Sequence, residues 1–283
     1  MKFDRRISRR SFLAAAAVSA AALALTACGG SASTASSAAA SSVAASSEAA
    51  STSAAAAELT TVEAGKLTMA TNATFPPYEM TTDAGTIEGI DVDTAQAIAE
   101  KLGLELQIDD MDFDAALLSV QQGKADIVMA GVTVTDERKA VMDFSDSYAT
   151  GIQSIIVPND SDIASPDDLS GKKIGTQRGT TGYIYCSDDF GDDAVVAYDS
   201  GLTAVQALNN GQVDAVVIDN APATEYVAAN PGLKVLDTSY AEEDYAIGMA
   251  KGSALEDAVN KALEELKADG TLQAIVDKYI NAN

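Results

Sequence analysis

Apolar and polar positions follow two different periods from residue 66 onward, and their order predicts the architecture. Short apolar runs at residues 66–70, 104–108 and 125–130 predict strands. The stretches 91–102 and 113–122 place apolar residues on one face and predict amphipathic helices. The order strand, helix, strand, helix, strand predicts a parallel sheet that is covered by helices on both faces.

A second unit of the same kind follows in the second half of the chain. Residues 122–128 (QGKADIV) and 210–216 (NGQVDAV) share one subpattern, in which a helix ends at a glycine and an apolar strand follows. This similarity predicts two lobes of like architecture instead of one long sheet. The elements of the second unit are expected at residues 173–175, 180–188, 194–198, 202–210, 213–218 and 221–230.

Two extended stretches, residues 151–157 and 245–250, lie beside the second unit, and a helical tail at 255–279 closes the chain. If the tail packs on the first lobe, the chain crosses between the lobes twice, and these stretches form a hinge. A ligand cleft is then expected between the carboxyl ends of the two sheets. The predicted fold class is α/β, with lobe 1 formed by residues 61–154 and 250–283 and lobe 2 by residues 155–249.

The first 27 residues have the pattern of a signal peptide. Residues 2–10 are basic, and residues 12–27 are Ala-rich, apolar and too short to span a bilayer well. Residues 8–13 (SRRSFL) are similar to the twin-arginine export motif. Export by the general secretory route is an equal alternative.

Residues 25–28 (LTAC) match a lipobox, in which cleavage precedes a lipid-modified cysteine. We expect Cys28 to carry acyl chains that anchor the protein to the membrane, whereas the plain alternative is a chance cysteine. The Ala/Ser-rich residues 28–60 offer too little apolar surface to fold and predict a flexible linker. An Ala-rich helix is the rival interpretation.

Composition excludes several classes of function. The formal net charge of −24 opposes binding to nucleic acid. The absence of histidine excludes His-based metal sites and Ser-His-Asp chemistry. The second cysteine, Cys186, has no partner thiol and is expected to pack in a helix. We expect no cofactor and no metal site.

Six motifs, taken together in order and spacing, resemble those of the family 3 solute-binding proteins, the polar-amino-acid receptors of ABC importers. The resemblance covers residues 64–281 and implies a type II periplasmic-binding-protein fold, binding without catalysis and a monomeric state. The motifs are residues 70–79 (ATNATFPPYE), 89–93 (GIDVD), 130–138 (AGVTVTDER), 143–145 (DFS), 175–181 (GTQRGTT) and 214–219 (DAVVID).

A free amino acid is a zwitterion, so a dry cleft must supply one cation for its carboxylate and one anion for its ammonium. Arg138 suits the first role because a guanidinium meets a carboxylate with two parallel hydrogen bonds. Asp219 follows an apolar strand and, by the resemblance, is the ammonium partner. The plain alternatives are a surface charge for Arg138 and a helix N-cap for Asp219.

Further ligand contacts come from both lobes. Gly131 and Thr133 follow a strand and can offer an amide and a hydroxyl to the carboxylate, and the carbonyl of Ala130 can accept from the ammonium. Thr180 and Thr181 open a helix whose first amides favour an anion. The remaining candidates are Phe75 and Phe113, which by the resemblance sandwich the ligand side chain unless they only pack in the core, and the polar Asn72 and Gln177.

The identity of the amino acid is the least determined part of this interpretation. Asn72 stands where many relatives have an acidic residue, and Gln177 is polar, which favours a neutral polar ligand such as glutamine. Glu79 can restore a negative charge, so a cationic amino acid is the alternative.

The function expected from the resemblance is capture of a free amino acid outside the cytoplasm and delivery to an ABC transporter permease. Two rivals stay open. One is a dehydratase of the cyclohexadienyl type on the same fold, with Glu79 or Asp219 as acid or base. The other is a sensor that acts through a separate partner.

Overall fold

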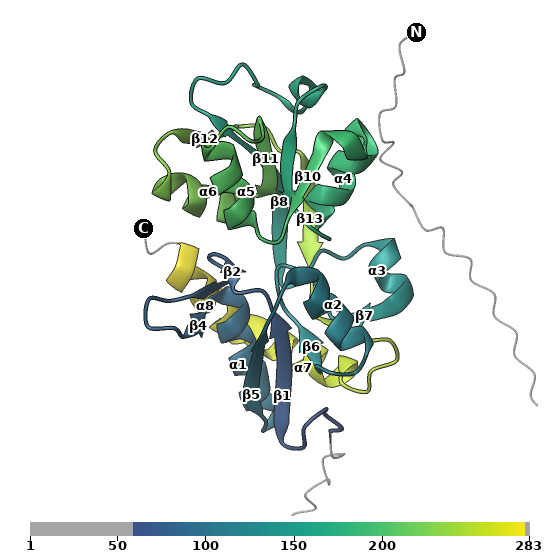
Figure 1. Ribbon diagram of the computed structural model, residues 1–283. Helices are drawn as coiled ribbons and strands as arrows, with labels where there is room; N and C mark the ends of the chain where they lie inside the picture. The colour runs from purple at the N-terminus through teal and green to yellow at the C-terminus, as the bar shows by residue number, and fades with distance from the viewer. Residues whose placement is uncertain (1–58, 281–283) are drawn as a thin grey trace, which may run out of the picture. The chain divides into compact units, whose positions relative to one another are not determined.

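The computed structural model of the protein describes residues 59–280, which form two lobes on two separate sheets (Figure 1). The predicted signal peptide at residues 1–27, the lipidation site Cys28 and the predicted linker up to residue 58 lie outside the described residues. Among residues 59–280, no helix combines the length and the apolar character that a membrane crossing requires.

The first lobe contains a five-stranded mixed sheet. Its strands are β1 (Lys66–Thr71), β5 (Glu105–Asp110), β6 (Ile127–Val128), β7 (Met142–Phe144) and β14 (Gly248–Ala250). In the order β5-β1-β6-β14-β7, β1 runs parallel to β5 and β6, as predicted. β14 pairs antiparallel with β6 and β7, so the sheet that contains the predicted parallel unit is mixed. The reason is that β14 returns from the second lobe in the opposite direction.

Helices cover this sheet much as the sequence predicts. They are α1 (Ile90–Leu102), α2 (Phe113–Gln121), α3 (Asp136–Val141), α7 (Glu256–Ala268) and α8 (Thr271–Ile280). The tail packs on the first lobe, where both α7 and α8 contact α1. The helical tail is divided into two helices at Gly270, which adopts a φ of 82°.

The second lobe contains a six-stranded sheet that is mixed in the same way. Its strands are β8 (Ala149–Pro158), β9 (Ile174–Gln177), β10 (Val195–Tyr198), β11 (Ala215–Asp219), β12 (Leu233–Val235) and β13 (Ala241–Tyr245). β9, β10 and β11 are parallel, and β8 pairs antiparallel with β11, β12 and β13. Its helices are α4 (Thr181–Phe190), α5 (Gly201–Asn209) and α6 (Asn220–Ala229), with 3-10 turns η1 (Pro166–Leu169) and η2 (Asp192–Ala194). Cys186 is fully buried in α4.

The chain passes between the two sheets along β8 and β13. These strands pair from Ala241 opposite Gln153 to Tyr245 opposite Ala149. Tyr245 also forms a bridge with Thr133 of the first lobe, and the chain then enters β14. Residues 245–250 therefore run from the second sheet into the first, whereas residues 151–157 lie within the second sheet, paired with β11, β12 and β13.

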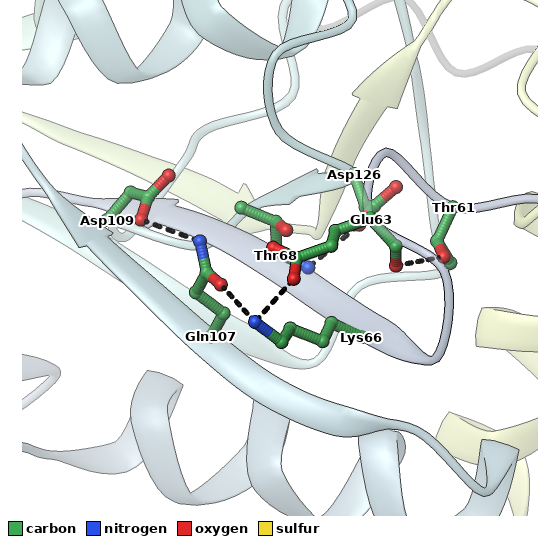
Figure 2. A network of polar contacts seen from close by, with 7 residues as sticks. All are labelled: Thr61, Glu63, Lys66, Thr68, Gln107, Asp109 and Asp126. Carbon is green, nitrogen blue, oxygen red and sulfur yellow. Dashed lines mark hydrogen bonds and ion pairs between the residues drawn. The ribbon is translucent and has the colours of Figure 1, made fainter.

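The repeated subpattern has a structural basis in two aspartates. Asp126 accepts hydrogen bonds from the amides of Val62 and Thr68, at 2.7 and 2.8 Å, and so ties the start of the first sheet together. Figure 2 shows Asp126 beside Thr68. Asp214 accepts from the amide of Lys173 at 2.8 Å in the second lobe. Each carboxylate thus satisfies backbone donors beside the first strand of its own parallel unit.

A small antiparallel sheet at the edge of the cleft was not predicted. It consists of β2 (Thr74–Phe75), β3 (Glu79–Thr81) and β4 (Ile87–Glu88). Strands of two or three residues are too short to show a period in the sequence. This sheet carries Phe75 and Glu79 to the cleft.

Candidate functional site

All the ligand contacts that the sequence predicts line one cavity between the lobes. The cavity and its opening to solvent together contain about 320 Å³ of space that is not filled by atoms. The residues that line it are the eleven predicted ones and Glu79: Asn72, Phe75, Glu79, Phe113, Ala130, Gly131, Thr133, Arg138, Gln177, Thr180, Thr181 and Asp219. Among the described residues, no group of His, Cys, Asp and Glu is arranged to hold a metal ion.

Arg138 reaches the cavity from the first turn of α3. The hydroxyl of Thr135 caps this helix by accepting from the amide of Arg138 at 3.2 Å. The guanidinium donates from Nη1 to the carbonyl of Thr133 at 2.8 Å and from Nη2 to the carbonyl of Gly179, in the other lobe, at 3.1 Å. The central carbon of the guanidinium, Cζ, lies 5.4 Å from the ring centre of Phe113. Arg138 is therefore a buried cation at the junction of the lobes and not a surface charge.

Asp219 faces Arg138's cavity from the second lobe, at the end of β11. It occupies the N-cap position of α6, but its side chain makes no capping hydrogen bond. Instead the carboxylate accepts from Nε2 of Gln153 at 2.8 Å and from the hydroxyl of Tyr245. Burial raises the pKa of Asp219 to about 7, and the charge of Glu243 adds to this effect.

Glu243 and Gln153 are buried beside the cavity and were not predicted. Oε2 of Glu243 accepts from the hydroxyls of Thr133 and Thr181, at 3.1 and 3.0 Å, and from Nε2 of Gln153 at 3.0 Å. Oε1 of Glu243 has no hydrogen-bond partner among the described residues. The available signal was the alternation of β13, which points Glu243 and the buried Tyr245 to the same face.

The amide of Gly131 is already engaged by a buried carboxylate. It donates to Oδ2 of Asp91 at 3.0 Å, and the hydroxyl of Tyr148 donates to the same oxygen at 2.8 Å. Gly131 has a φ of 56°, and a Cβ there would lie 2.8 Å from the ring of Phe75. The glycine therefore allows the ring of Phe75 to pack closely over the loop.

Two carboxyl groups of this region are fully buried. Glu79 and Asp91 both have no exposed surface. Burial raises the pKa of Glu79 well above its usual value, and the charge of Asp91 raises it further. Burial also raises the pKa of Asp91 to about 6, against the opposing effect of the hydrogen bonds from Gly131 and Tyr148.

Asn72 and Gln177 join the lobes directly. Nε2 of Gln177 donates to Oδ1 of Asn72 at 2.9 Å, and Nδ2 of Asn72 donates to the carbonyl of Met111 at 2.9 Å. Nearby, the hydroxyl of Tyr226 in the second lobe donates to the carbonyl of Thr74 in the first. These side chains form one wall of the cavity and use much of their hydrogen-bonding capacity on the protein itself.

The start of α4 forms the opposite wall. Thr180 is the N-cap, and its hydroxyl accepts from the amide of Tyr183 at 3.3 Å. The next residue, Thr181, donates to Glu243. The first amides of a helix attract anions, so this wall suits a carboxylate.

The site contains more acidic than basic side chains. Four carboxyl groups, from Glu79, Asp91, Asp219 and Glu243, are buried in or beside the cavity. Arg138 is the one cationic side chain in the lining that the structure describes. Such a set can bind a carboxylate at Arg138 and has acidic groups left over for one or more positive charges.

Comparison with known proteins gives consistent matches. The family model of bacterial extracellular solute-binding proteins, family 3, matches residues 67–282. The L-cystine-binding protein TcyJ of Escherichia coli (strain K12) is 34% identical over 225 residues, covering 78% of this chain and 85% of TcyJ. The solved arginine-, lysine-, histidine-binding protein ArtJ from Geobacillus stearothermophilus has a TM-score of 0.74 at 35% identity and covers 77% of this chain and 96% of its own. An ancestral arginine-binding protein bound to glutamine has a TM-score of 0.73 at 43% identity, and the match covers 76% of this chain and 98% of the ancestral protein.

Proposed function

Because the chain belongs to family 3 of the bacterial extracellular solute-binding proteins, we propose that it captures a free L-amino acid between its lobes and delivers it to an ABC transporter permease. The observation that carries this proposal is that Arg138 of one lobe and Asp219 of the other line a single cavity. A zwitterion placed there meets a cation at one end and an anion at the other.

The α-carboxylate of the ligand is assigned to Arg138 and the start of α4. A guanidinium has five N–H donors, and the bonds to the carbonyls of Thr133 and Gly179 use two of them. The donors that are left can meet a carboxylate in two parallel bonds. The ammonium is assigned to Asp219, whose carboxylate is ionised more readily once a cation lies beside it.

We assign a cationic amino acid as the preferred ligand, in place of the neutral one that Asn72 favours. Glu79 lines the cavity, and neither of its carboxylate oxygens has a hydrogen-bond partner among the described residues. A guanidinium or ammonium at the end of the ligand side chain would satisfy them. ArtJ binds arginine, lysine and histidine by its description, which supports this choice.

A neutral polar ligand such as glutamine is the second candidate. The similar ancestral protein, an arginine-binding protein, was solved with glutamine bound. Asn72 and Gln177 in the cavity wall favour the same class of ligand.

The test of ligand binding is a thermal-shift screen of the purified protein against the common amino acids, followed by calorimetry of the hits. We expect stabilisation by arginine or lysine, and weaker stabilisation by glutamine. If no α-amino acid changes the melting temperature or releases heat, the proposed function is wrong. Incubation with prephenate or arogenate and analysis of the products tests the dehydratase alternative, and we expect no turnover.

We further propose that the mature protein is a monomer that is lipid-anchored through Cys28 on the outer side of the cell membrane. The lipobox at residues 25–28 supports the anchor. Cys28→Ala should move the protein from the membrane fraction to the medium or to the soluble extracytoplasmic fraction, as measured by immunoblotting. Cys186→Ala is the matched control and should leave the protein membrane-bound. Membrane retention of the Cys28→Ala protein would contradict the anchor.

A further inference from the structure

Glu79 is a buried acid at the wall of the cavity, and no donor among the described residues gives it a hydrogen bond. It is the first residue of β3, its residue exposure is 0%, and neither Oε1 nor Oε2 has a hydrogen-bond partner in the described part of the chain. An ionised carboxylate left in this state loses its hydration without compensation. The group must therefore either hold a proton or receive a cation from outside the protein.

The surroundings of Glu79 do not supply that cation. The ionisable groups that act on Glu79, or on which it acts, are all acids or phenols: Tyr78, Asp91, Asp110, Tyr148, Asp219 and Tyr226. Arg138, the cation of the same cavity, is bonded to the carbonyls of Thr133 and Gly179. No ion pair joins Glu79 to a lysine or arginine among residues 59–280.

The neighbouring Asp91 lies within hydrogen-bonding reach of Glu79, but as an acid it can only share a proton with Glu79 and supplies no cation. Oδ2 of Asp91 is occupied by the amide of Gly131 and the hydroxyl of Tyr148, while no donor among the described residues reaches Oδ1. Two adjacent buried carboxyl groups disfavour each other's ionisation. Because Asp91 already has two donors and Glu79 has none, Glu79 is the member of the pair that retains the proton.

From this geometry, and resting on the proposed function, we propose that Glu79 selects ligands by exchanging a proton for a side-chain cation. When an amino acid with a neutral side chain is bound, Glu79 stays protonated and donates a hydrogen bond. When a guanidinium or ammonium side chain is bound, the proton of the Glu79 carboxyl passes to bulk solvent and the carboxylate pairs with the ligand. The charge of the site changes little in either case, so one cavity accepts both classes.

This exchange predicts that pH controls the selectivity between two ligands of the same shape. Arginine and citrulline have the same length and the same α-groups, and differ in a guanidinium against a neutral urea. Dividing their affinities cancels the contributions of Arg138, Asp219 and the other groups at the zwitterionic end. The ratio that is left should increase with pH by up to about tenfold per unit while Glu79 is mostly protonated.

The experiment is titration calorimetry on the purified full-length protein with arginine and citrulline, from pH about 5 to about 8. Each point is measured in two buffers of different ionisation enthalpy, so that released protons are counted. We expect arginine to release close to one proton more than citrulline in the acidic part of this range, and the affinity ratio to rise with pH.

The variant Glu79→Gln provides the second measurement. In this variant the ratio of arginine to citrulline affinity should no longer depend on pH, and arginine should no longer release an additional proton. Arginine binding should weaken by at least about tenfold, whereas citrulline binding should be retained. Glu105→Gln, an exposed carboxyl on β5 of the same lobe, is the matched control and should behave as the unchanged protein.

Three outcomes would overturn the proton exchange at Glu79. Equal proton counts for the two ligands, or a ratio that is constant with pH, overturn the exchange while leaving amino acid binding intact. A Glu79→Gln protein that keeps the pH-dependent ratio overturns it as well. If neither ligand binds at any pH, the assignment of a cationic ligand fails, and the exchange fails with it. The proton count of the unchanged protein does not depend on whether the variant folds.

Discussion

At the scale of single residues, the cavity depends on charges that are taken out of water. Arg138 is 8% exposed, and its guanidinium is bonded to both lobes. Burial lowers the pKa of Arg138, whereas the charges of Glu243 and Asp219 raise it. A guanidinium keeps its charge in proteins even where burial lowers its pKa, so Arg138 supplies the cation that a carboxylate ligand requires.

Arg138→Ala should weaken binding of every amino acid ligand by at least about a hundredfold, because removing one member of a buried charge pair costs about 3 to 5 kcal/mol. The measurement is titration calorimetry on a variant whose folding is checked by circular dichroism. Arg178→Ala is the matched control, since Arg178 is exposed and its Nη2 lies 3.7 Å from Oδ1 of Asp199 at the surface. A loss of less than about tenfold for Arg138→Ala would contradict the assignment of Arg138 to the carboxylate.

At the scale of elements, the two lobes repeat one device. In each, a helix ends at a glycine with positive φ, Gly123 or Gly211, and an aspartate three residues later binds backbone amides beside the first parallel strand. Asp126 binds two amides and is buried, whereas Asp214 binds one and is exposed. The same motif is therefore expected to contribute unequally in the two lobes.

Asp126→Ala should lower the free energy of unfolding by about 1 to 3 kcal/mol, because it leaves the amides of Val62 and Thr68 without their acceptor. Asp214→Ala is the matched variant in the second lobe and should cost less, about 0.5 to 1.5 kcal/mol. Urea unfolding of both proteins measures the difference. Equal losses, or a larger loss for Asp214→Ala, would show that burial of the carboxylate does not determine its contribution.

At the scale of the whole molecule, buried acids at the junction of the lobes connect stability to pH. The pKa of Asp219 is about 7 and that of Asp91 about 6, both above the value of 3.8 for an exposed aspartate. Between the unfolded pKa of 3.8 and these folded values, the folded protein binds more protons than the unfolded chain. Stability from these groups is thus fully present at low pH and is lost as the pH rises through about 4 to 7.

The ligand-free protein should therefore become less stable from pH about 4 to about 7, by up to about 1.4 kcal/mol per pH unit for each group. A bound ammonium beside Asp219 offsets this loss, so the increase in melting temperature on adding ligand should be larger at the high end of the range. Thermal unfolding at several pH values, with and without ligand, measures both effects. Asp219→Asn should flatten the pH dependence in part, and stability that rises across this range would contradict the argument.

The sequence by itself indicated most of the local elements, the two-lobed α/β class and eleven of the twelve residues that line the cavity. Periodicity is a property of neighbouring residues, so α1 and β1 were predicted within one residue of their ends. The family resemblance likewise indicated Arg138 and Asp219, and Asp219 also stands directly after a predicted apolar strand. The tertiary structure alone decided how these groups are used.

Thr133 meets Glu243 across 110 positions of the chain, and Gln177 meets Asn72 across 105. No local pattern records such pairs. For the same reason, three features became known only from the fold: the hydrogen bond from Gly131 to Asp91, the absence of a described donor to Glu79, and the antiparallel pairing of β14 with β6. The balance of buried charge, on which the choice of ligand depends, is a sum over residues that only folding brings together.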